Sequence, residues 1–420
     1  MQPTDARHLK ARIIVAGGRI TQVNGSFHVP RQSGAGCYRV TIDGLFPTCS
    51  CDDHDLTGGE CKHILAARLW VVEKGSETQP APAEPVAPPT TPKRKTYVQD
   101  WPNYNLAQNR EKDHFQDLLA DLCQPIPDPA RNPKGGRPTV PARDAAFFAI
   151  FKVYCGFSAR RFACDVQSAH DRGCVSAPVS HNSVLKALES PALTPHLHDL
   201  IRRSAAPLAA VEQDFAVDSS GFCTNSYTRW FDVKYGQKEL QQWVKPHIVT
   251  GVRTNVVTAV EIHDKRKNDC NVLPSLVQTT AKTFTVREVS ADKAYTATAN
   301  FEAVEKHGGT LYAAFKNNST GGVGGLYQKM YHLFSLNRED YLTHYHKRSN
   351  VESTFSAVKR KFGEMVRSKT ETAQTNEVLC KFVCQNVTCL ISAMYELGIT
   401  PPGWSDVAGD RAVIPFPGVG

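Results

Sequence analysis

The sequence has 420 residues, of which 41% are hydrophobic and 21% are charged, and its formal net charge is +8. A chain of this length exceeds what one hydrophobic core usually fills, so two or three domains are expected. The positive charge favours a polyanionic partner such as nucleic acid. Thirteen cysteines, with no apolar leader before them, argue against a disulfide framework and for a reducing compartment. The apolar runs are too short to span a bilayer, so no membrane partner is expected.

Residues 1–74 are expected to form a small β/α domain. The β-branched stretches at 12–23, 27–30 and 37–43 favour strands, and "CKHILAARLWVVEKG" at 61–75 favours a helix. Four metal-ligating residues interrupt this segment as C-x-C, nine residues, C-x-H: Cys49, Cys51, Cys61 and His63. Three thiolates and one imidazole make a tetrahedral set for one structural zinc ion, with no open position for a substrate. The alternatives are four unrelated polar positions, or a site in which His54 replaces one ligand.

This cysteine and histidine pattern resembles the SWIM zinc finger over roughly residues 36–72. The resemblance implies a module that recognises DNA or protein and performs no chemistry itself.

A linker follows at residues 75–100. Six prolines lie between Pro80 and Pro92, which indicates an extended, semi-rigid segment.

Residues 101–210 read as an all-α region with a proposed role in DNA binding. Helical patterns lie at 105–123, 141–156, 158–173, 180–190 and 193–208. Ser180 is a suitable N-cap, and the pair of helices around it suits either a helix-turn-helix or an ordinary helical hairpin. Arg137, in the basic loop "NPKGGRPTVPARD", is a candidate DNA contact, and a plain basic linker is the alternative.

Residues 211–400 alternate between strands and helices, which predicts an α/β domain with helices on a sheet. Two long helices, at about 340–362 and 372–397, complete this domain. "GGVGGLY" at 321–327 is expected to be a loop, because it lacks a nucleotide-binding context. No P-loop is present, so no nucleotide cofactor is expected. Residues 401–420 form a tail.

Two aspartates end strands of this domain, Asp218 in "EQDFAVDSSGF" and Asp292 in "TVREVSADKAYTA". Carboxylates at strand ends lie where α/β sheets bind ligands. Each residue alone could instead be a turn or N-cap aspartate.

A third carboxylate, Glu352, lies in the basic stretch "HYHKRSNVESTFSAVKRKFG". On one continuous helix Tyr345, Arg348, Glu352 and Lys359 share an arc of about 60°. The apolar residues Val351, Phe355, Val358 and Phe362 form a neighbouring stripe that can pack on the sheet. A surface ion pair between Arg348 and Glu352 would explain two of these residues, and it leaves Tyr345 and Lys359 unexplained.

The interval Tyr345-x₂-Arg348-x₃-Glu352-x₆-Lys359 is that of the Y-R-E-K signature of insertion-sequence transposases in the DDE superfamily, which this chain resembles over roughly residues 100–400. "AVDSSGF" and "VSADKAY" are similar to the first and second aspartate motifs of that family. The resemblance implies a ribonuclease-H-like domain with Asp218, Asp292 and Glu352 as catalytic triad. The short interval from Asp292 to Glu352 leaves no room for the large inserted domain of some relatives.

Such a triad suits phosphoryl transfer with two Mg²⁺ or Mn²⁺ ions, because hard cations prefer carboxylate oxygens. Arg348 and Lys359 would contact phosphates near the cut, and Tyr345 would hydrogen-bond or stack there. Further DNA contacts are expected from basic residues of the same edge, Lys347, Arg360 and Lys361.

The leading hypothesis is therefore a metal-dependent DNA transposase that binds its element ends as a homodimer in a prokaryotic cytoplasm, associated with the nucleoid. One alternative is a catalytically inactive or domesticated DNA-binding protein. Another is a related nuclease that cleaves without strand transfer.

Overall fold

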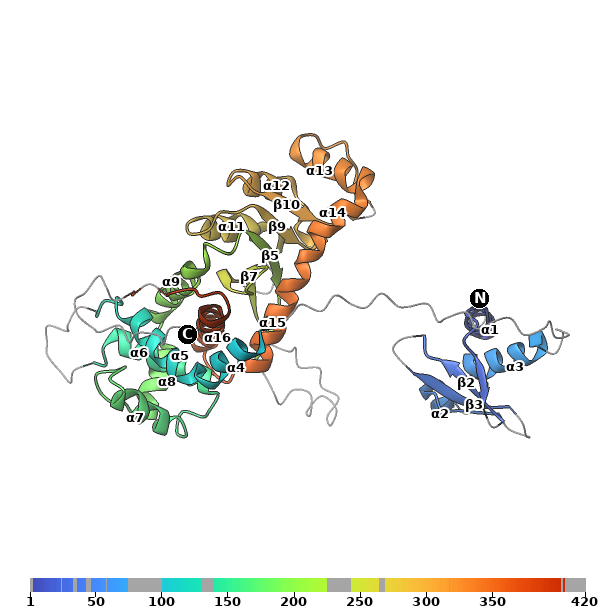
Figure 1. Ribbon diagram of the computed structural model, residues 1–420, viewed down its shortest axis with the longest axis horizontal. Helices are drawn as coiled ribbons and strands as arrows, with labels where there is room; N and C mark the ends of the chain where they lie inside the picture. The colour runs from blue at the N-terminus through green and yellow to red at the C-terminus, as the bar shows by residue number, and fades with distance from the viewer. Residues whose placement is uncertain are drawn as a thin grey trace. The chain divides into compact units, whose positions relative to one another are not determined.

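The computed structural model describes residues 3–23, 25–32, 36–42, 47–57, 59–74, 100–129, 139–224, 243–263, 269–316, 318–401 and 403–404. The chain divides into two compact units, Met1–Thr96 and Tyr97–Gly420, each with a hydrophobic core of its own (Figure 1). Most of the predicted linker and tail, together with Arg137, lie outside the described residues.

The first unit is a four-stranded antiparallel sheet packed with helices. Its strands, in spatial order, are β1 (Thr21–Val23), β2 (Ser26–Pro30), β3 (Cys37–Thr41) and β4 (Thr48–Cys49). The helices are α1 (Pro3–Ala16), α2 (Asp52–Thr57) and α3 (Lys62–Lys74), with α1 packed against α3. The small sheet carrying the cysteines agrees with the predicted β/α domain.

One strand prediction in this unit was wrong. Residues 12–16 continue α1, and only Thr21–Val23 of the predicted stretch is a strand. Ala11, Ile14 and Val15 are buried at a helical spacing, while Arg12 and Ile13 are exposed. That buried stripe outweighs the β-preference of the individual residues.

The second unit begins with the predicted helical region. It contains α4 (Trp101–Asn109), α5 (Glu111–Cys123), α6 (Ala142–Cys155), α7 (Ala163–Asp171), α8 (His181–Glu189), α9 (Leu193–Ala205) and the 3-10 turn η1 (Ala206–Leu208). The stretch expected as one helix at 105–123 is two, because the backbone leaves helical geometry at Arg110. Ser180 caps α8 as predicted, since its side chain accepts a hydrogen bond from the Ser183 amide.

A mixed sheet follows. Its strands are β5 (Asp214–Ser219), β6 (Phe222–Cys223), β7 (Trp243–Gly251), β8 (Val257–His263), β9 (Glu288–Ala291) and β10 (Thr310–Ala313). The order is β10-β9-β5-β7-β6, with β8 also paired to β7. β10, β9 and β5 are parallel, whereas β7 is antiparallel to β5 and β8. The predicted α/β architecture with a helix-covered mixed sheet is therefore confirmed.

Helices cover both faces of this sheet. α11 (Leu273–Ala281) and α12 (Thr298–Glu305) contact β8 and β10, while α14 (Arg338–Tyr345) and α15 (Ser349–Phe362) lie along β10, β9, β5 and β7 (Figure 1). Short 3-10 turns, η2 (Asp269–Asn271) and η3 (Lys293–Tyr295), precede α11 and α12.

The predicted long helix at 340–362 is interrupted. A 3-10 turn, η4 (His346–Arg348), separates α14 from α15, so the chain stays helical but winds more tightly there. The angular positions expected from one regular helix therefore hold within α15 and not across η4.

The predicted loop at 321–327 is shorter than expected. It ends at Gly324, which has a positive φ of 83° and precedes α13 (Gly325–Leu336). Tyr327 is buried in α13 against Phe301 and Phe315. The glycines therefore mark the start of a helix and not only a loop.

The last helix, α16 (Glu371–Glu396), runs through the core of this unit. It packs against α4, α5, α6, α8 and α9 and also against β7 and β8. It is long and apolar enough to cross a membrane by composition, but 78% of its apolar window is buried inside the protein. The helical region and the sheet therefore share one hydrophobic core.

Candidate active site

Two aspartates lie at the carboxyl ends of adjacent parallel strands in the mixed sheet. β5 and β9 are parallel neighbours in which Val217 is paired with Ala291, so Asp218 and Asp292 follow on adjacent strands at the same level. Phe215, Ala216 and Val217 are fully buried because β5 is a central strand. Asp218 is the residue at which this buried strand reaches a cavity.

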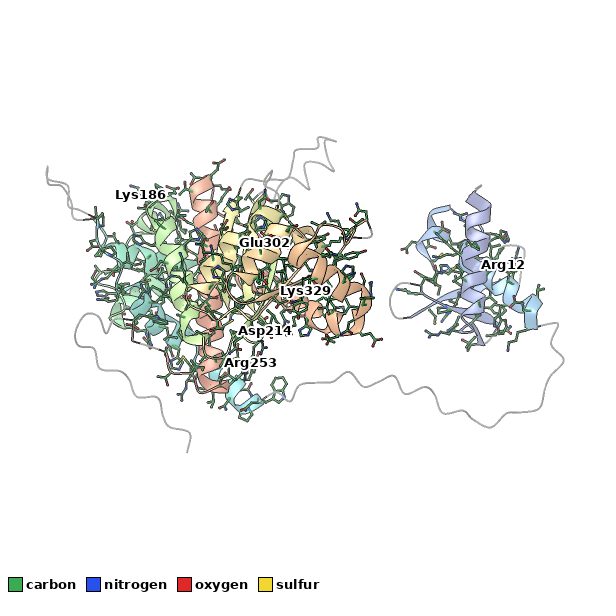
Figure 2. All side chains as sticks on the ribbon, turned by 90° about the horizontal axis from the view of Figure 1, so that it is seen from above. Arg12, Lys186, Asp214, Arg253, Glu302 and Lys329 are labelled. Carbon is green, nitrogen blue, oxygen red and sulfur yellow. The ribbon has the colours of Figure 1, made fainter. Side chains whose placement is uncertain are left out.

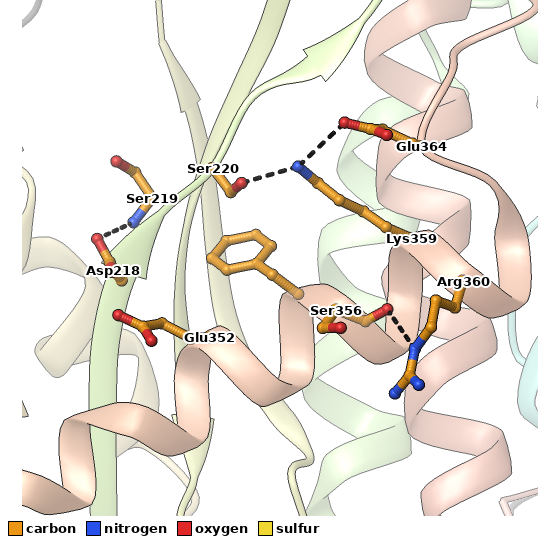
Figure 3. A pocket seen from close by; sticks show the side chains of 9 residues that line it. Asp218, Ser219, Ser220, Glu352, Ser356, Lys359, Arg360 and Glu364 are labelled. Atoms are coloured by element: carbon orange, nitrogen blue, oxygen red, sulfur yellow. Dashed lines mark hydrogen bonds and ion pairs between the residues drawn. The ribbon is translucent and has the colours of Figure 1, made fainter. Parts of the chain in front are cut away.

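Helix α15 carries Glu352 to the same place. Its apolar stripe is buried as predicted, and the Thr354 hydroxyl is hydrogen-bonded to that of Thr250 on β7 at 3.0 Å. These contacts fix the rotation of α15, which leaves the Glu352 side chain 57% exposed and beside Asp218 (Figure 3). Three separate elements thus supply the three predicted carboxylates.

Arg348 spans two of them. Its Nη1 lies 3.4 Å from an oxygen of Asp218, and its Nη2 lies 2.8 Å from an oxygen of Glu352. The expected pair between Arg348 and Glu352 at i,i+4 is therefore present, but the same guanidinium also reaches the sheet. The Asp292 backbone carbonyl accepts a hydrogen bond from the Tyr295 amide at 2.9 Å, whereas its side chain has no hydrogen-bond or ion-pair partner among the described residues.

The charges of the three carboxylates influence one another. Burial raises the pKa of Asp218, and the negative charges of Asp292 and Glu352 raise it further, whereas the Ser219 amide and the Arg348 cation lower it. A carboxylate is thus kept near two like charges in a partly desolvated position. Such an arrangement is typical of a site that binds cations or performs chemistry.

A cavity of about 420 Å³ opens beside Asp218 and Glu352 (Figure 3). Lys359 lines it, and its Nζ donates to the Ser220 hydroxyl at 3.0 Å and lies 4.0 Å from a Glu364 oxygen. Arg360 also lines it but points away from the carboxylates. The cavity therefore contains the predicted triad residues Asp218 and Glu352 together with two predicted cations.

Five other lining residues were not predicted as part of the site: Ser219, Ser220, Ser356, Glu364 and Phe355, which was expected only in the packing stripe. The Ser-Ser-Gly break after Asp218 was the available signal for the two serines, since a polar turn at a strand end contributes side chains to the same edge. Nothing in the sequence indicated Glu364, whose position depends on how the chain leaves α15.

The remaining predicted DNA contacts are placed differently. Tyr345 packs partly against the core, and its ring centroid lies 6.0 Å from the Arg348 guanidinium carbon. Lys347 is ion-paired with Asp214 at 2.8 Å and with Glu288 at 2.6 Å, at the opposite ends of β5 and β9.

Lys361 is ion-paired with Glu111 of α5 at 2.5 Å. The cations of Lys347 and Lys361 are thus bound within the protein, and their contact with DNA stays a prediction. Figure 2 labels Lys186 on α8 and Asp214 on β5, which lie in different parts of this unit.

The three carboxylates are chemically suited to Mg²⁺ or Mn²⁺, which prefer oxygen ligands. Three carboxylates that come from separate elements can share two such ions.

The cysteine cluster forms a second candidate site, in the first unit. Cys49, Cys51, Cys61 and His63 are all buried, and their ligand atoms lie within 4.8 Å of one another. His63 Nδ1 is 3.9 Å from Cys49 Sγ and 3.8 Å from Cys61 Sγ. A tetrahedral zinc ion with ordinary bond lengths would separate such atoms by about 3.6 Å. The four residues therefore fit one zinc ion.

The protonation of these thiols also favours a cation. Hydrogen bonds with Cys49 and His63 lower the pKa of Cys61, whereas the hydrogen bond with Cys61 and burial raise the pKa of Cys49. The cluster alone thus stabilises one thiolate, whereas zinc stabilises all three. His54 lies outside the group of four residues whose ligand atoms are within 4.8 Å of one another, and its Nδ1 is hydrogen-bonded to the Gly59 carbonyl at 2.8 Å.

Comparison with known families agrees with both sites. Residues 210–387 match the family model of the transposase DDE domain, and residues 38–67 match that of the SWIM zinc finger. The chain carries a transposase DDE domain and a SWIM zinc finger. No curated protein is detectably similar to it.

The DDE domain contains β5 to β10, α14, α15 and most of α16, and with them all three carboxylates, Arg348 and Lys359. The SWIM finger contains the four residues of the cysteine cluster. Both predicted resemblances are thereby confirmed, and the DDE domain identifies a transposase function in coarse terms.

Proposed function

We propose that the chain is a DNA transposase that cleaves and transfers DNA strands at the ends of its own mobile element. Asp218, Asp292 and Glu352 are the proposed catalytic triad on a ribonuclease-H-like fold. The observation that supports this most strongly is that β5, the end of β9 and α15 of the DDE domain each contribute one carboxylate to the same place, with Asp218 and Glu352 lining one cavity.

The proposed mechanism is in-line displacement at phosphorus. Divalent ions, when bound, would activate the attacking hydroxyl and stabilise the leaving oxygen. Asp218 would hold both ions, and Asp292 and Glu352 mainly one each. Lys359, held by Ser220 inside the cavity, would bind a phosphate oxygen of the strand that is cut.

The proposed DNA-binding parts are the SWIM finger with one zinc ion and the helical region at 101–210. Two element ends must be held together for transposition, so the active complex is proposed to be a homodimer on double-stranded DNA. We assign the protein to the cytoplasm of a prokaryote, where it meets the nucleoid.

A strand-cleavage assay tests this function. The substrate is duplex DNA carrying the terminal repeats that flank the reading frame, incubated with the full chain and Mg²⁺ or Mn²⁺. Asp218→Ala, Asp292→Ala and Glu352→Ala are each expected to lower cleavage by at least about a thousandfold, because loss of a metal ligand removes transition-state charge stabilisation. Glu302→Gln, at an exposed position on α12, is the control for removing a carboxylate and should retain cleavage.

The outcomes separate the competing functions. Binding of the repeats without cleavage by the wild-type protein would favour an inactive DNA-binding protein. Cleavage without joining to a target duplex would favour a nuclease. Full activity in any of the three alanine variants would remove that residue from the triad.

A further inference from the structure

Arg348 is the one described cation that forms ion pairs with the proposed triad. Its two terminal nitrogens reach different elements, one to Asp218 on β5 and the other to Glu352 on α15. Asp292 has no ion-pair partner among the described residues. A single guanidinium therefore balances part of the charge of three neighbouring carboxylates.

The position of Arg348 is built into the fold. It lies at the junction of η4 and α15, with its side chain only 23% exposed and its guanidinium carbon 6.0 Å from the Tyr345 ring centroid. The planar fork of an arginine suits two carboxylates at once, which a lysine ammonium does not.

The other nearby cations are bound elsewhere. Lys359 lines the same cavity, but its Nζ is held by the Ser220 hydroxyl and lies 4.0 Å from Glu364. Lys347 is paired with Asp214 and Glu288. Lys359 therefore provides a charge-matched comparison for Arg348, because it lies in the same cavity without contacting the triad.

We propose that Arg348 is a built-in counterion of the metal site. It pairs with Asp218 and Glu352 until divalent cations occupy these carboxylates, and displacement from them frees its guanidinium to bind a DNA phosphate. This inference rests on the proposed catalytic triad. Its consequence is a competition: metal binding must break two ion pairs and place like charges near one another.

The test measures the affinity of the zinc-loaded full chain for Mn²⁺ in the absence of DNA, from the electron paramagnetic resonance signal of free Mn²⁺. Arg348→Gln is expected to bind Mn²⁺ about three- to tenfold more tightly than the wild type, since two partly exposed ion pairs no longer compete. Arg348→Lys should lie between the two proteins. Lys359→Gln, which removes the same charge from the same cavity, should change the affinity by less than about twofold.

A structural readout accompanies the binding data. With zinc bound and no other divalent cation present, Arg348→Gln is expected to have a lower melting temperature than the wild type, because its carboxylates lose their counterion, and Mn²⁺ should raise its melting temperature by more. If Arg348→Gln does not fold, the Mn²⁺ affinity of Arg348→Lys is compared with that of the wild type, and this comparison alone tests the counterion role.

Unchanged or weaker Mn²⁺ binding in the Arg348 variants would overturn the inference. An equal gain in Mn²⁺ affinity in Lys359→Gln would also overturn it, because the gain would then reflect only the change in net charge. Asp218→Asn distinguishes this failure from that of the proposed function. If Asp218→Asn loses the Mn²⁺ site while the Arg348 variants behave as wild type, only the counterion role falls. If Asp218→Asn still binds Mn²⁺ as wild type, the triad itself is wrong as a metal site.

Discussion

Ser220 is the residue that holds Lys359 in the cavity. Its hydroxyl accepts a hydrogen bond from Lys359 Nζ at 3.0 Å, and the lysine ammonium lies 5.4 Å from the Phe222 ring centroid. Ser220→Ala leaves the ammonium without this anchor. We expect strand cleavage to fall about ten- to a hundredfold, because a hydrogen bond to a charged group contributes about 1.5–3 kcal/mol.

Three measurements identify Ser220 as a positioning residue rather than a structural one. Ser220→Thr keeps the hydroxyl and should restore most of the cleavage rate. Ser220→Ala combined with Lys359→Gln should be no slower than Lys359→Gln alone, since both changes remove one interaction. Ser356→Ala, which alters another serine of the same cavity, is the control. Equal losses in Ser220→Ala and Ser356→Ala would contradict the role of Ser220.

Among the elements, the hairpin of β3 and β4 and the start of α3 depend on the zinc ligands. Cys49, Cys51 and Cys61 are themselves part of the small core of the first unit. A domain of this size gains much of its folding free energy from a structural metal. Cys61→Ser is therefore expected to lower zinc content from about one ion per chain to near zero and to make the first unit sensitive to limited proteolysis.

Cys37→Ser is the matched control for this change. Cys37 is an exposed cysteine of β3, in the same sheet and outside the cluster. It should retain zinc and resistance to protease. Wild-type zinc content in Cys61→Ser would contradict the assignment of Cys61 as a ligand.

Element types were largely predictable and their junctions were not. The stripe of Val351, Phe355, Val358 and Phe362 is visible in the sequence because its spacing is helical, and all four residues are buried. The tightening at η4 was not visible, because helical backbone angles continue through it and no glycine or proline marks it. Residues 12–16 were misread because β-branched residues also form a buried helical stripe.

At the scale of the whole molecule, buried thiols make stability sensitive to alkaline pH. Burial raises the pKa of six cysteines outside the zinc cluster above the ordinary value of 9.0: Cys123, Cys155, Cys270, Cys380, Cys384 and Cys389. Below pH 9 both the folded and unfolded chains keep these protons. Above pH 9 the unfolded chain releases them while the folded chain retains them, so the free energy of unfolding falls as pH rises.

Urea unfolding with a reductant at pH 7.5, 9 and 10 measures this effect. Cys384→Ala should reduce the fall in the free energy of unfolding between pH 9 and pH 10 by at most about 1.4 kcal/mol, which is the contribution of one thiol over one pH unit. Cys164→Ser, at an exposed position of α7, should leave the pH dependence of the free energy of unfolding as in the wild type.

Lys381 acts in the opposite direction to the thiols. Burial lowers its pKa to about 8, so the free energy of unfolding gains a contribution from Lys381 as pH rises from 8 to 10.5. A rise in net stability above pH 9 would contradict the dominant role of the thiols.

Long-range pairs explain what the sequence could not predict about the site. The two aspartates could be proposed from the sequence because they end predicted strands, and Glu352 because of the Y-R-E-K interval. The contact of Arg348 with Asp218 joins residues 130 positions apart, and that of Lys361 with Glu111 joins residues 250 apart. Such pairs depend on the packing of α15 against the sheet and α5, which local patterns do not encode.

The shared core around α16 limits how the protein can be recombined during evolution. Helices of 101–210 and strands of the DDE domain bury their apolar residues against the same helix, so neither can be exchanged without rebuilding the other. The zinc-finger unit buries its own separate set. We therefore expect relatives to differ in the presence of the finger more readily than in the pairing of the helical region with the sheet.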